Sequence, residues 1–156
     1  SNDVHHEIEM IVALRSGGSN IDVSQADTHI FGYSIGLDMT RRDLQAEMKR
    51  LGRPWEVSKA VEGSAPTSQL HLREEKGFIK SGRIELRVNG EIKQESDLSM
   101  MIWTVSEQIS ILSEYYELAA GDIIMTGTPA GVGPVQKGDV MHGSIEGLGE
   151  LTVTVD

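Results

Sequence analysis

The 156-residue sequence contains no cysteine. This absence excludes disulfides, zinc–thiolate sites and thiol nucleophiles, and it agrees with the reducing cytoplasm, where we expect the protein. No apolar run reaches the length of a membrane span, and no signal peptide is visible. The chain also lacks an initial methionine and enters a strand-like pattern within a few residues, so we expect further residues upstream.

Basic residues are scarce as well, since 14 Lys and Arg stand against 24 Asp and Glu, a net charge of −10. Such a charge argues against a nucleic-acid partner and against an anionic membrane surface. A hydrophobic content of 38% and a charged content of 24% are typical of a globular protein. The length predicts one domain, residues 1–156. The 17 glycines indicate many turns and a β-rich chain.

A strand followed by a helix is predicted around Asp38. Apolar residues alternate over residues 33–37, so Asp38 ends a strand on the side opposite the apolar side chains. Thr40 and Asp43 have a spacing like that of a capping box, which predicts a helix that runs to Gly52. Taken alone, an Asp in this place is more often a cap or turn residue than a ligand.

Two glutamates share one face of a strand predicted over residues 4–14. Two positions along a strand span roughly 6.5 Å, so Glu7 and Glu9 are close neighbours that repel each other. Such a pair is tolerated on a solvated face or around a cation, and the pattern by itself favours the solvated face. His5 and His6 point in opposite directions along the strand, so we interpret them as structural.

A lysine interrupts an apolar face of a third strand, predicted over residues 55–61. Lys59 lies on the same side as Trp55, Val57 and Val61. Its ammonium group either reaches the sheet edge or is held in a pocket to meet a substrate anion or a developing oxyanion. The pattern leaves both alternatives open.

The remaining elements are read from periodicity and turn signals. Asn89 and Gly90 predict a hairpin turn. The glycine-rich stretch of residues 126–133 can offer backbone N–H and hydroxyl donors to an anion, but it is neither a P-loop nor a dinucleotide fingerprint, and a structural loop is the default. We further predict helices over residues 24–31 and 106–118, a buried strand over 123–126, and closing strands over 139–145 and 151–155.

Five segments together resemble one family. They are HHEIEM at 5–10, GYSIGLDMTRRDLQ at 32–45, GRPWEVSKA at 52–60, RVNGEIKQ at 87–94 and GDIIMTGTPAGVGPVQKGD at 121–139. Over essentially its whole length the chain resembles the fumarylacetoacetate hydrolase family, and within it the bacterial fumarylpyruvate and acylpyruvate hydrolases. The resemblance implies a β-rich α+β fold, a mixed β-roll with a few short helices, and usually a homodimer.

The same resemblance implies the site residues. Glu7, Glu9 and Asp38 correspond to the carboxylates that hold Mg²⁺ or Mn²⁺, for which Ca²⁺ is a conceivable substitute, and hard oxygen ligands suit such cations. The remaining positions match catalytic and substrate-binding residues, Lys59 and Thr128, and two further substrate-binding residues, Arg42 and Gln45.

The implied activity is metal-dependent hydrolysis of a C–C bond in a 2,4-diketo acid, with fumarylpyruvate cleaved to fumarate and pyruvate in gentisate breakdown. Two alternatives stay open: a decarboxylase or isomerase of oxaloacetate or a related 2-oxo diacid, and a non-catalytic metal-binding domain. The chain departs from the family in two ways. Relatives carry a catalytic His before the E-x-E strand, where this chain has no counterpart, and they often have an aromatic residue and Asp where Val61 and Glu62 stand.

Overall fold

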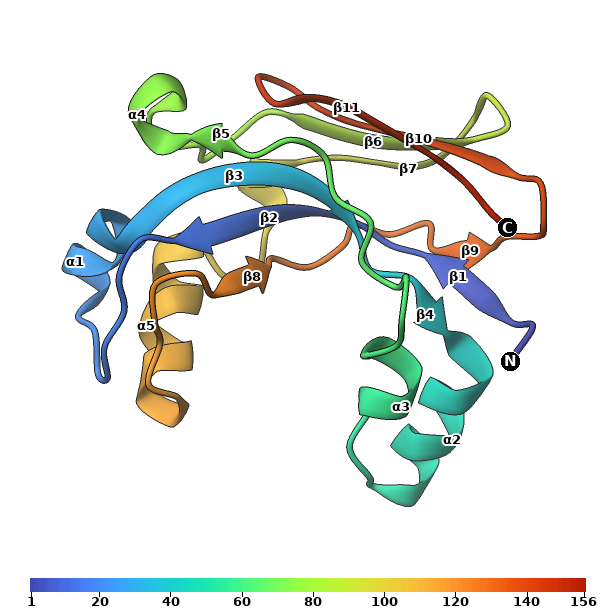
Figure 1. Ribbon diagram of the computed structural model, residues 1–156, viewed down its shortest axis with the longest axis horizontal. Coiled ribbons are helices and arrows are strands. Elements are labelled where there is room, and N and C mark those ends of the chain that lie inside the picture. Colours follow the sequence, from blue (N-terminus) through green and yellow to red (C-terminus); the bar gives the residue numbers. More distant parts are fainter.

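The computed structural model describes residues 1–156 and consists mainly of antiparallel sheets. Two four-stranded sheets lie one above the other, and a small third sheet extends one end of the lower layer (Figure 1). The lower sheet has the order β5 (His71–Leu72), β3 (Ile30–Leu37), β2 (Ile8–Leu14) and β8 (Ile123–Met125). The upper sheet has the order β11 (Gly149–Thr154), β10 (Val140–Ile145), β6 (Arg83–Val88) and β7 (Glu91–Asp97). The third contains β4 (Thr40–Arg41), β1 (Val4–His6) and β9 (Gly133–Pro134).

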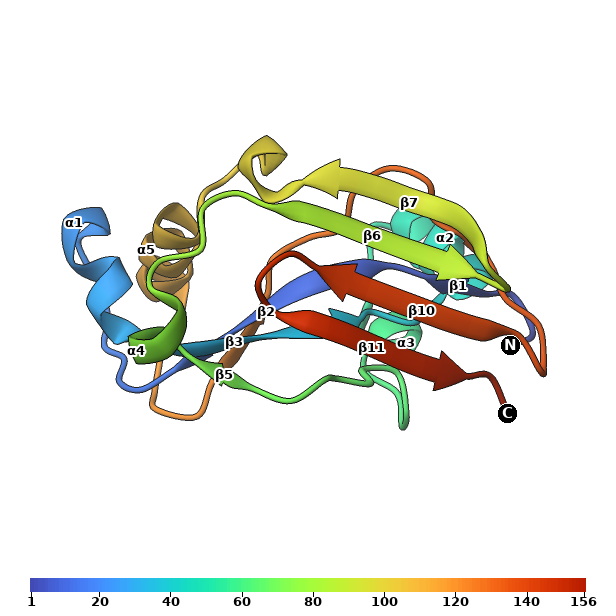
Figure 2. The same cartoon turned by 90° about the horizontal axis from the view of Figure 1, so that it is seen from above.

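Short helices gather at the two ends of the lower layer (Figures 1 and 2). At one end α1 (Val23–Ala26) packs against α5 (Val105–Tyr115), and at the other α2 (Arg42–Leu51) packs against α3 (Glu56–Lys59). The others are α4 (Arg73–Lys76) and the 3₁₀ helices η1 (Asp27–His29) and η2 (Leu98–Met100). None of the helices is long and apolar enough to cross a membrane.

The core lies between the two large sheets. Strands β2 and β3 pair over their full length, with Ile8 opposite Leu37 and Met10 opposite Ile35, and all four side chains are buried. The upper sheet approaches closely here, because a Cβ on Gly143 would lie 2.9 Å from Ile8 Cδ1. Since side chains alternate along a strand, Ile8 and Met10 face this core while their acidic neighbours face away from it.

Several predicted elements are confirmed. Asn89 and Gly90 turn between β6 and β7 with φ of 51° and 84°, the left-handed conformation that a two-residue hairpin turn requires. The closing strands are present as β10 and β11. The helix predicted over residues 106–118 is α5, whose capping box is formed by Thr104 and Glu107.

The strand predicted over residues 55–61 is wrong. These residues form the one-turn helix α3, and Trp55 and Val57 on the supposed apolar face are 45% and 52% exposed. Local hydrogen bonds hold the turn, since the Ser58 hydroxyl donates to the carbonyl of Trp55. A seven-residue alternation is too short to separate a strand from a turn that has no neighbouring strand to pair with.

The helix starts were also misread. Helix α2 begins at Arg42 without a side-chain cap, because Thr40 is fully buried in β4 instead. The helix predicted over residues 24–31 is limited to α1 and η1, with Asp22 as its N-cap, since strand β3 already begins at Ile30. Strand β8 is less buried than predicted, with Ile123 57% exposed.

Candidate metal centre

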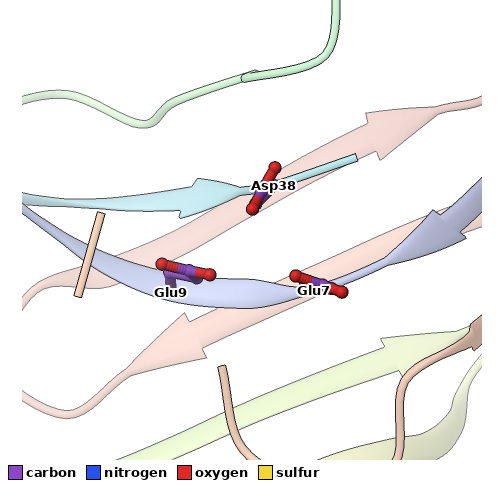
Figure 3. A group of neighbouring side chains, drawn as sticks. All are labelled: Glu7, Glu9 and Asp38. Carbon is purple, nitrogen blue, oxygen red and sulfur yellow. The ribbon is translucent and has the colours of Figure 1, made fainter. Parts of the chain in front are cut away.

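Three carboxylates meet where the lower sheet joins the small one. Glu7 lies between β1 and β2, Glu9 lies on β2, and Asp38 follows β3 and faces both from the neighbouring segment (Figure 3). The backbone N–H of Asp38 donates to the carbonyl of Glu7 at 2.8 Å, so pairing of the two segments sets this arrangement. One oxygen from each carboxylate lies within 4.8 Å of the others. The sheet therefore holds three acidic oxygens around one point.

The prediction that Glu7 and Glu9 lie on a solvated strand face is wrong. Glu7 and Glu9 are only 7% and 4% exposed. Burial disfavours the charged form of a carboxylate, and like charges add to that cost. The cluster therefore needs compensating cations.

Lys59 is one of those cations. Its ammonium Nζ donates to Glu7 Oε2 at 2.8 Å, to Thr40 Oγ1 at 2.7 Å and to Asp38 Oδ2. The segment is tied in place because the Ser64 hydroxyl donates to the Lys59 carbonyl at 2.7 Å. Of the two alternatives for this lysine, the structure shows the pocket: the ammonium group is held by the buried Glu7 and Thr40 and the partly buried Asp38. All three of its N–H donors are in use.

Arg42 is the second cation. At the start of α2, its Nη2 donates to Glu7 Oε1 and its Nη1 donates to Gln45 Oε1 at 2.6 Å. The Nε of Arg42 is buried and has no hydrogen-bond partner. The first turn of α2 thus joins Arg42 and Gln45 to the carboxylates and leaves one buried donor unused.

The charges of the cluster do not balance. When all three carboxylates are ionised, they face two cationic side chains, which leaves one negative charge in excess. Burial raises the pKa of Glu9 to about 7, the Gly127 N–H opposes this, and the charges of Asp38 and Glu7 add to it. Burial opposes protonation of Lys59, yet its hydrogen bonds to Asp38 and Glu7 raise its pKa above the ordinary value. An all-oxygen donor set with excess negative charge fits a hard divalent cation.

The glycine-rich loop reaches the cluster through its backbone. Thr126 is anchored on β2, since its hydroxyl donates to the carbonyl of Met10 at 2.8 Å. The next residue, Gly127, donates its N–H to Glu9 Oε2 at 2.7 Å. Thr128 follows, and its Oγ1 accepts a hydrogen bond from Gln94 Nε2 at 2.8 Å. The loop is therefore part of the site as well as a structural connection.

The sequence pattern of the family described as "Fumarylacetoacetate (FAA) hydrolase C-terminal" matches residues 1–156. The chain belongs to the fumarylacetoacetate hydrolase family.

Relatives of known name support this membership. A fumarylpyruvate hydrolase from Ralstonia sp is 42% identical over 155 residues, which are 99% of this chain and 80% of that protein. A mitochondrial oxaloacetate tautomerase from Homo sapiens is 37% identical over 156 residues, which are 100% of this chain and 71% of the relative.

A crystal structure of fumarylpyruvate hydrolase from Pseudomonas aeruginosa in complex with Mn²⁺ and pyruvate superimposes with a TM-score of 0.98 at 48% identity. The match covers 99% of this chain and 66% of the Pseudomonas chain, so this chain spans just under two thirds of that protein. The predictions of the family and of its β-rich fold are confirmed, and the predicted enzyme class, which hydrolyses C–C bonds in ketonic substances, is that of the fumarylpyruvate hydrolases among the relatives.

A cleft of about 700 Å³ opens beside the glycine-rich loop of this family domain. Its walls are mostly apolar side chains of η2, α5 and β8, and Asp97 is its one charged residue. Gly127 and Thr128 line it, whereas the three carboxylates do not. The loop therefore stands between the carboxylate cluster and an apolar space.

Sequence reasoning missed two groups at the site, Thr40 and Gln94. Thr40 was read as a helix cap, although its hydroxyl meets Lys59. The Gly127 N–H belongs to the stretch whose backbone donors were named as an option for an anion, and it donates to the Glu9 carboxylate. Gln94 ends the hairpin motif RVNGEIKQ, yet its amide is buried against the loop. In each case the relevant neighbour is distant in sequence, so no local pattern could reveal the contact.

Proposed function

We propose that residues 1–156 form one catalytic domain that hydrolyses a C–C bond in a 2,4-diketo acid, with fumarylpyruvate cleaved to fumarate and pyruvate. Glu7, Glu9 and Asp38 would hold Mg²⁺ or Mn²⁺. The observation that carries the proposal is a cluster of three carboxylates, Glu7 and Glu9 buried and Asp38 partly buried, whose oxygens lie within 4.8 Å of one another and outnumber the neighbouring cationic side chains. Support comes from the fumarylpyruvate hydrolases among the relatives.

The charge of the loaded site suits an anionic substrate. A divalent cation would neutralise the carboxylates and supply positive charge to the substrate's carboxylate and 2-oxo group. Adding two positive charges to a cluster with one negative charge in excess leaves one positive charge. A 2-oxo carboxylate therefore brings the complementary charge.

The chain's own groups have distinct roles in this scheme. In the reaction, water adds to the distal carbonyl, the C–C bond breaks, and its electron pair forms an enolate of pyruvate that is then protonated. An ordinary lysine is protonated at neutral pH, and hydrogen bonds to Asp38 and Glu7 raise the pKa of Lys59 further in the metal-free site. We assign its charge to the developing enolate. We assign Thr128 as a hydroxyl donor to the substrate, and Arg42 and Gln45 as substrate-binding groups.

A second candidate is an oxaloacetate tautomerase or decarboxylase. It is favoured by the mitochondrial oxaloacetate tautomerases of Mus musculus and Homo sapiens, at 39% and 37% identity. Enolate stabilisation beside a cation serves all of these reactions. Only the hydrolase also needs a water molecule activated to attack a carbonyl, whereas a tautomerase moves a proton and a decarboxylase releases CO₂. A third reading, a metal-binding domain without turnover, stays as the outcome in which neither substrate reacts.

A product assay separates these candidates. The protein is supplied with Mg²⁺ or Mn²⁺, and then with a chelator, and fumarylpyruvate and oxaloacetate are offered separately. Metal-dependent release of fumarate and pyruvate from the first substrate is expected. Enolisation of oxaloacetate or CO₂ release without cleavage of fumarylpyruvate would instead favour the second candidate. A place in aromatic (gentisate) catabolism, a cytoplasmic location and a homodimer remain predictions, the last tested by sedimentation.

A further inference from the structure

Gln94 makes four hydrogen bonds from a position that is 1% exposed on β7. Its Oε1 accepts from the backbone N–H of Ile8 at 3.1 Å and pairs with His6 Nδ1 at 2.9 Å. Its Nε2 donates to Thr128 Oγ1 at 2.8 Å and to the carbonyl of Pro129 at 2.9 Å. Both N–H donors and both acceptor sites of the Gln94 amide are used. These hydrogen bonds join the strand segment beside Glu7 to the glycine-rich loop.

Two backbone groups fix the orientation of this amide. A backbone N–H such as that of Ile8 can only donate, so it must face Oε1. A carbonyl such as that of Pro129 can only accept, so it must face Nε2. An amide turned by 180° would set donor against donor and acceptor against acceptor in a buried place. The orientation therefore follows from the chain itself.

The fixed amide determines the state of both of its side-chain neighbours. Oε1 cannot donate, so His6 must carry its proton on Nδ1. Nε2 occupies an acceptor position of the Thr128 hydroxyl, and no other group of the chain accepts that hydroxyl's proton. The O–H of Thr128 is thus left free to donate.

We propose that Gln94 is a positioning residue that holds the Thr128 hydroxyl as a hydrogen-bond donor toward the substrate's oxygens. The inference rests on the proposed function, in which Thr128 contacts the substrate. If the Thr128 hydroxyl rotated freely, only some of its rotamers would donate a hydrogen bond to the ligand, and the others would donate to the loop. With its acceptor side held by Gln94, its O–H is already prepared for an anionic oxygen, which lowers the entropic cost of binding.

The first test determines the orientation of the Gln94 amide and needs no activity measurement. The ¹⁵N shifts of the His6 ring should show the proton on Nδ1 in the wild-type protein. A neutral ring with its proton on Nε2 and none on Nδ1 would overturn the inference, because it would require the reversed amide.

The second test is a double-mutant cycle on ligand binding. Thr128→Val removes the hydroxyl at similar volume, and Gln94→Glu replaces the donor by an acceptor that would capture the hydroxyl proton. Pyruvate affinity of the Mn²⁺-supplied protein, measured by calorimetry, should fall at least about tenfold in each single variant, the loss typical of one hydrogen bond to a charged group. The double variant should bind no more weakly than either single variant.

A matched control and a second variant test whether a loss of pyruvate affinity reflects general structural damage. Gln108→Glu makes the same chemical change at an amide that donates to the Thr126 carbonyl of the same loop without touching Thr128, and pyruvate affinity should stay within about twofold of wild type. Melting curves check folding. If Gln94→Glu does not fold, Gln94→Met takes its place in the cycle, with the same expected absence of added loss.

The outcomes separate this inference from the proposed function. Losses that multiply in the double variant, or wild-type affinity in Gln94→Glu, overturn the role of Gln94 even if the wild-type protein cleaves fumarylpyruvate. Wild-type protein that binds pyruvate with Mn²⁺ but does not cleave fumarylpyruvate refutes the hydrolase alone, and the binding cycle still decides on Gln94.

Discussion

The buried carboxyl of Glu9 should make the metal-free protein less stable as the pH rises. Its pKa is raised from the ordinary value of 4.5 to about 7, chiefly by burial. The folded state therefore holds this proton more tightly than the unfolded chain does. Stability contributed by the neutral form is fully present below pH 4.5 and is lost as the pH rises from there through about 7.

The size of the effect follows from the shift. One pKa unit corresponds to about 1.4 kcal/mol, so ionisation of Glu9 lowers the free energy of unfolding by about 3 kcal/mol between pH 4.5 and pH 8. Glu9→Gln cannot ionise and keeps an oxygen for the Gly127 N–H. In chelator at pH 8 this variant should melt about 6–12 °C above wild type, and near pH 4.5 the two should agree.

Thermal unfolding of both proteins across this pH range measures the difference. Every other titrating group is shared, so subtracting the two curves isolates Glu9. Added Mn²⁺ at pH 8 should reverse the order, because on the proposed assignment it stabilises wild type and not the variant. A difference that stays constant with pH, or a Gln variant that is the less stable at pH 8 in chelator, would refute the reasoning.

Three further perturbations follow from the same site and from α5. Asp38→Ala should abolish metal-dependent product release in the coupled pyruvate assay, and an unchanged rate would remove Asp38 from the ligand set. Lys59→Met should destabilise the metal-free protein by up to about 3 kcal/mol in urea titrations, the lower end for a buried ion pair, because it removes a cation from the buried Glu7 and the partly buried Asp38. Lys80→Met, at an exposed lysine, is the control. Thr104→Ala should cost about 1 kcal/mol in the same titrations through loss of the capping box, and an unchanged midpoint would contradict a role for that cap.

The parts of the fold that follow from local chemistry were predictable. The hairpin at Asn89 and Gly90 depends on two residues that tolerate positive φ, and the strand ending at Asp38 depends on regular alternation. The strand predicted around Lys59 failed because neither strand nor helix is stabilised by those seven residues alone. The Ser58–Trp55 hydrogen bond holds the turn from within, and the Ser64 hydrogen bond and the ion pairs of Lys59 with Glu7 and Asp38 fix it from outside those residues.

The residues of the candidate site could be predicted from the sequence, but their burial and hydrogen bonds could not. The spacing of Glu7 and Glu9 raises the question of a cation, and resemblance to the family adds Asp38 and Lys59. The burial of both glutamates depends on packing of the lower sheet against the helices and the glycine-rich loop, which alternation along one strand does not report. The amide of Gln94 depends on the same tertiary contacts.

The three hydrogen bonds of the Lys59 ammonium have a consequence for assembly of the holoprotein. Because this lysine acts as an internal counter-ion, we expect the chain to reach its native fold before any metal arrives, unlike a zinc finger that is unfolded without its ion. An incoming cation must then compete with an ammonium group already in place. Metal loading thus requires the Lys59 ammonium to give up hydrogen bonds to Glu7 and Asp38 while it stays in the site as a cation, and the affinity of the site for metal is lowered by the free energy of those hydrogen bonds.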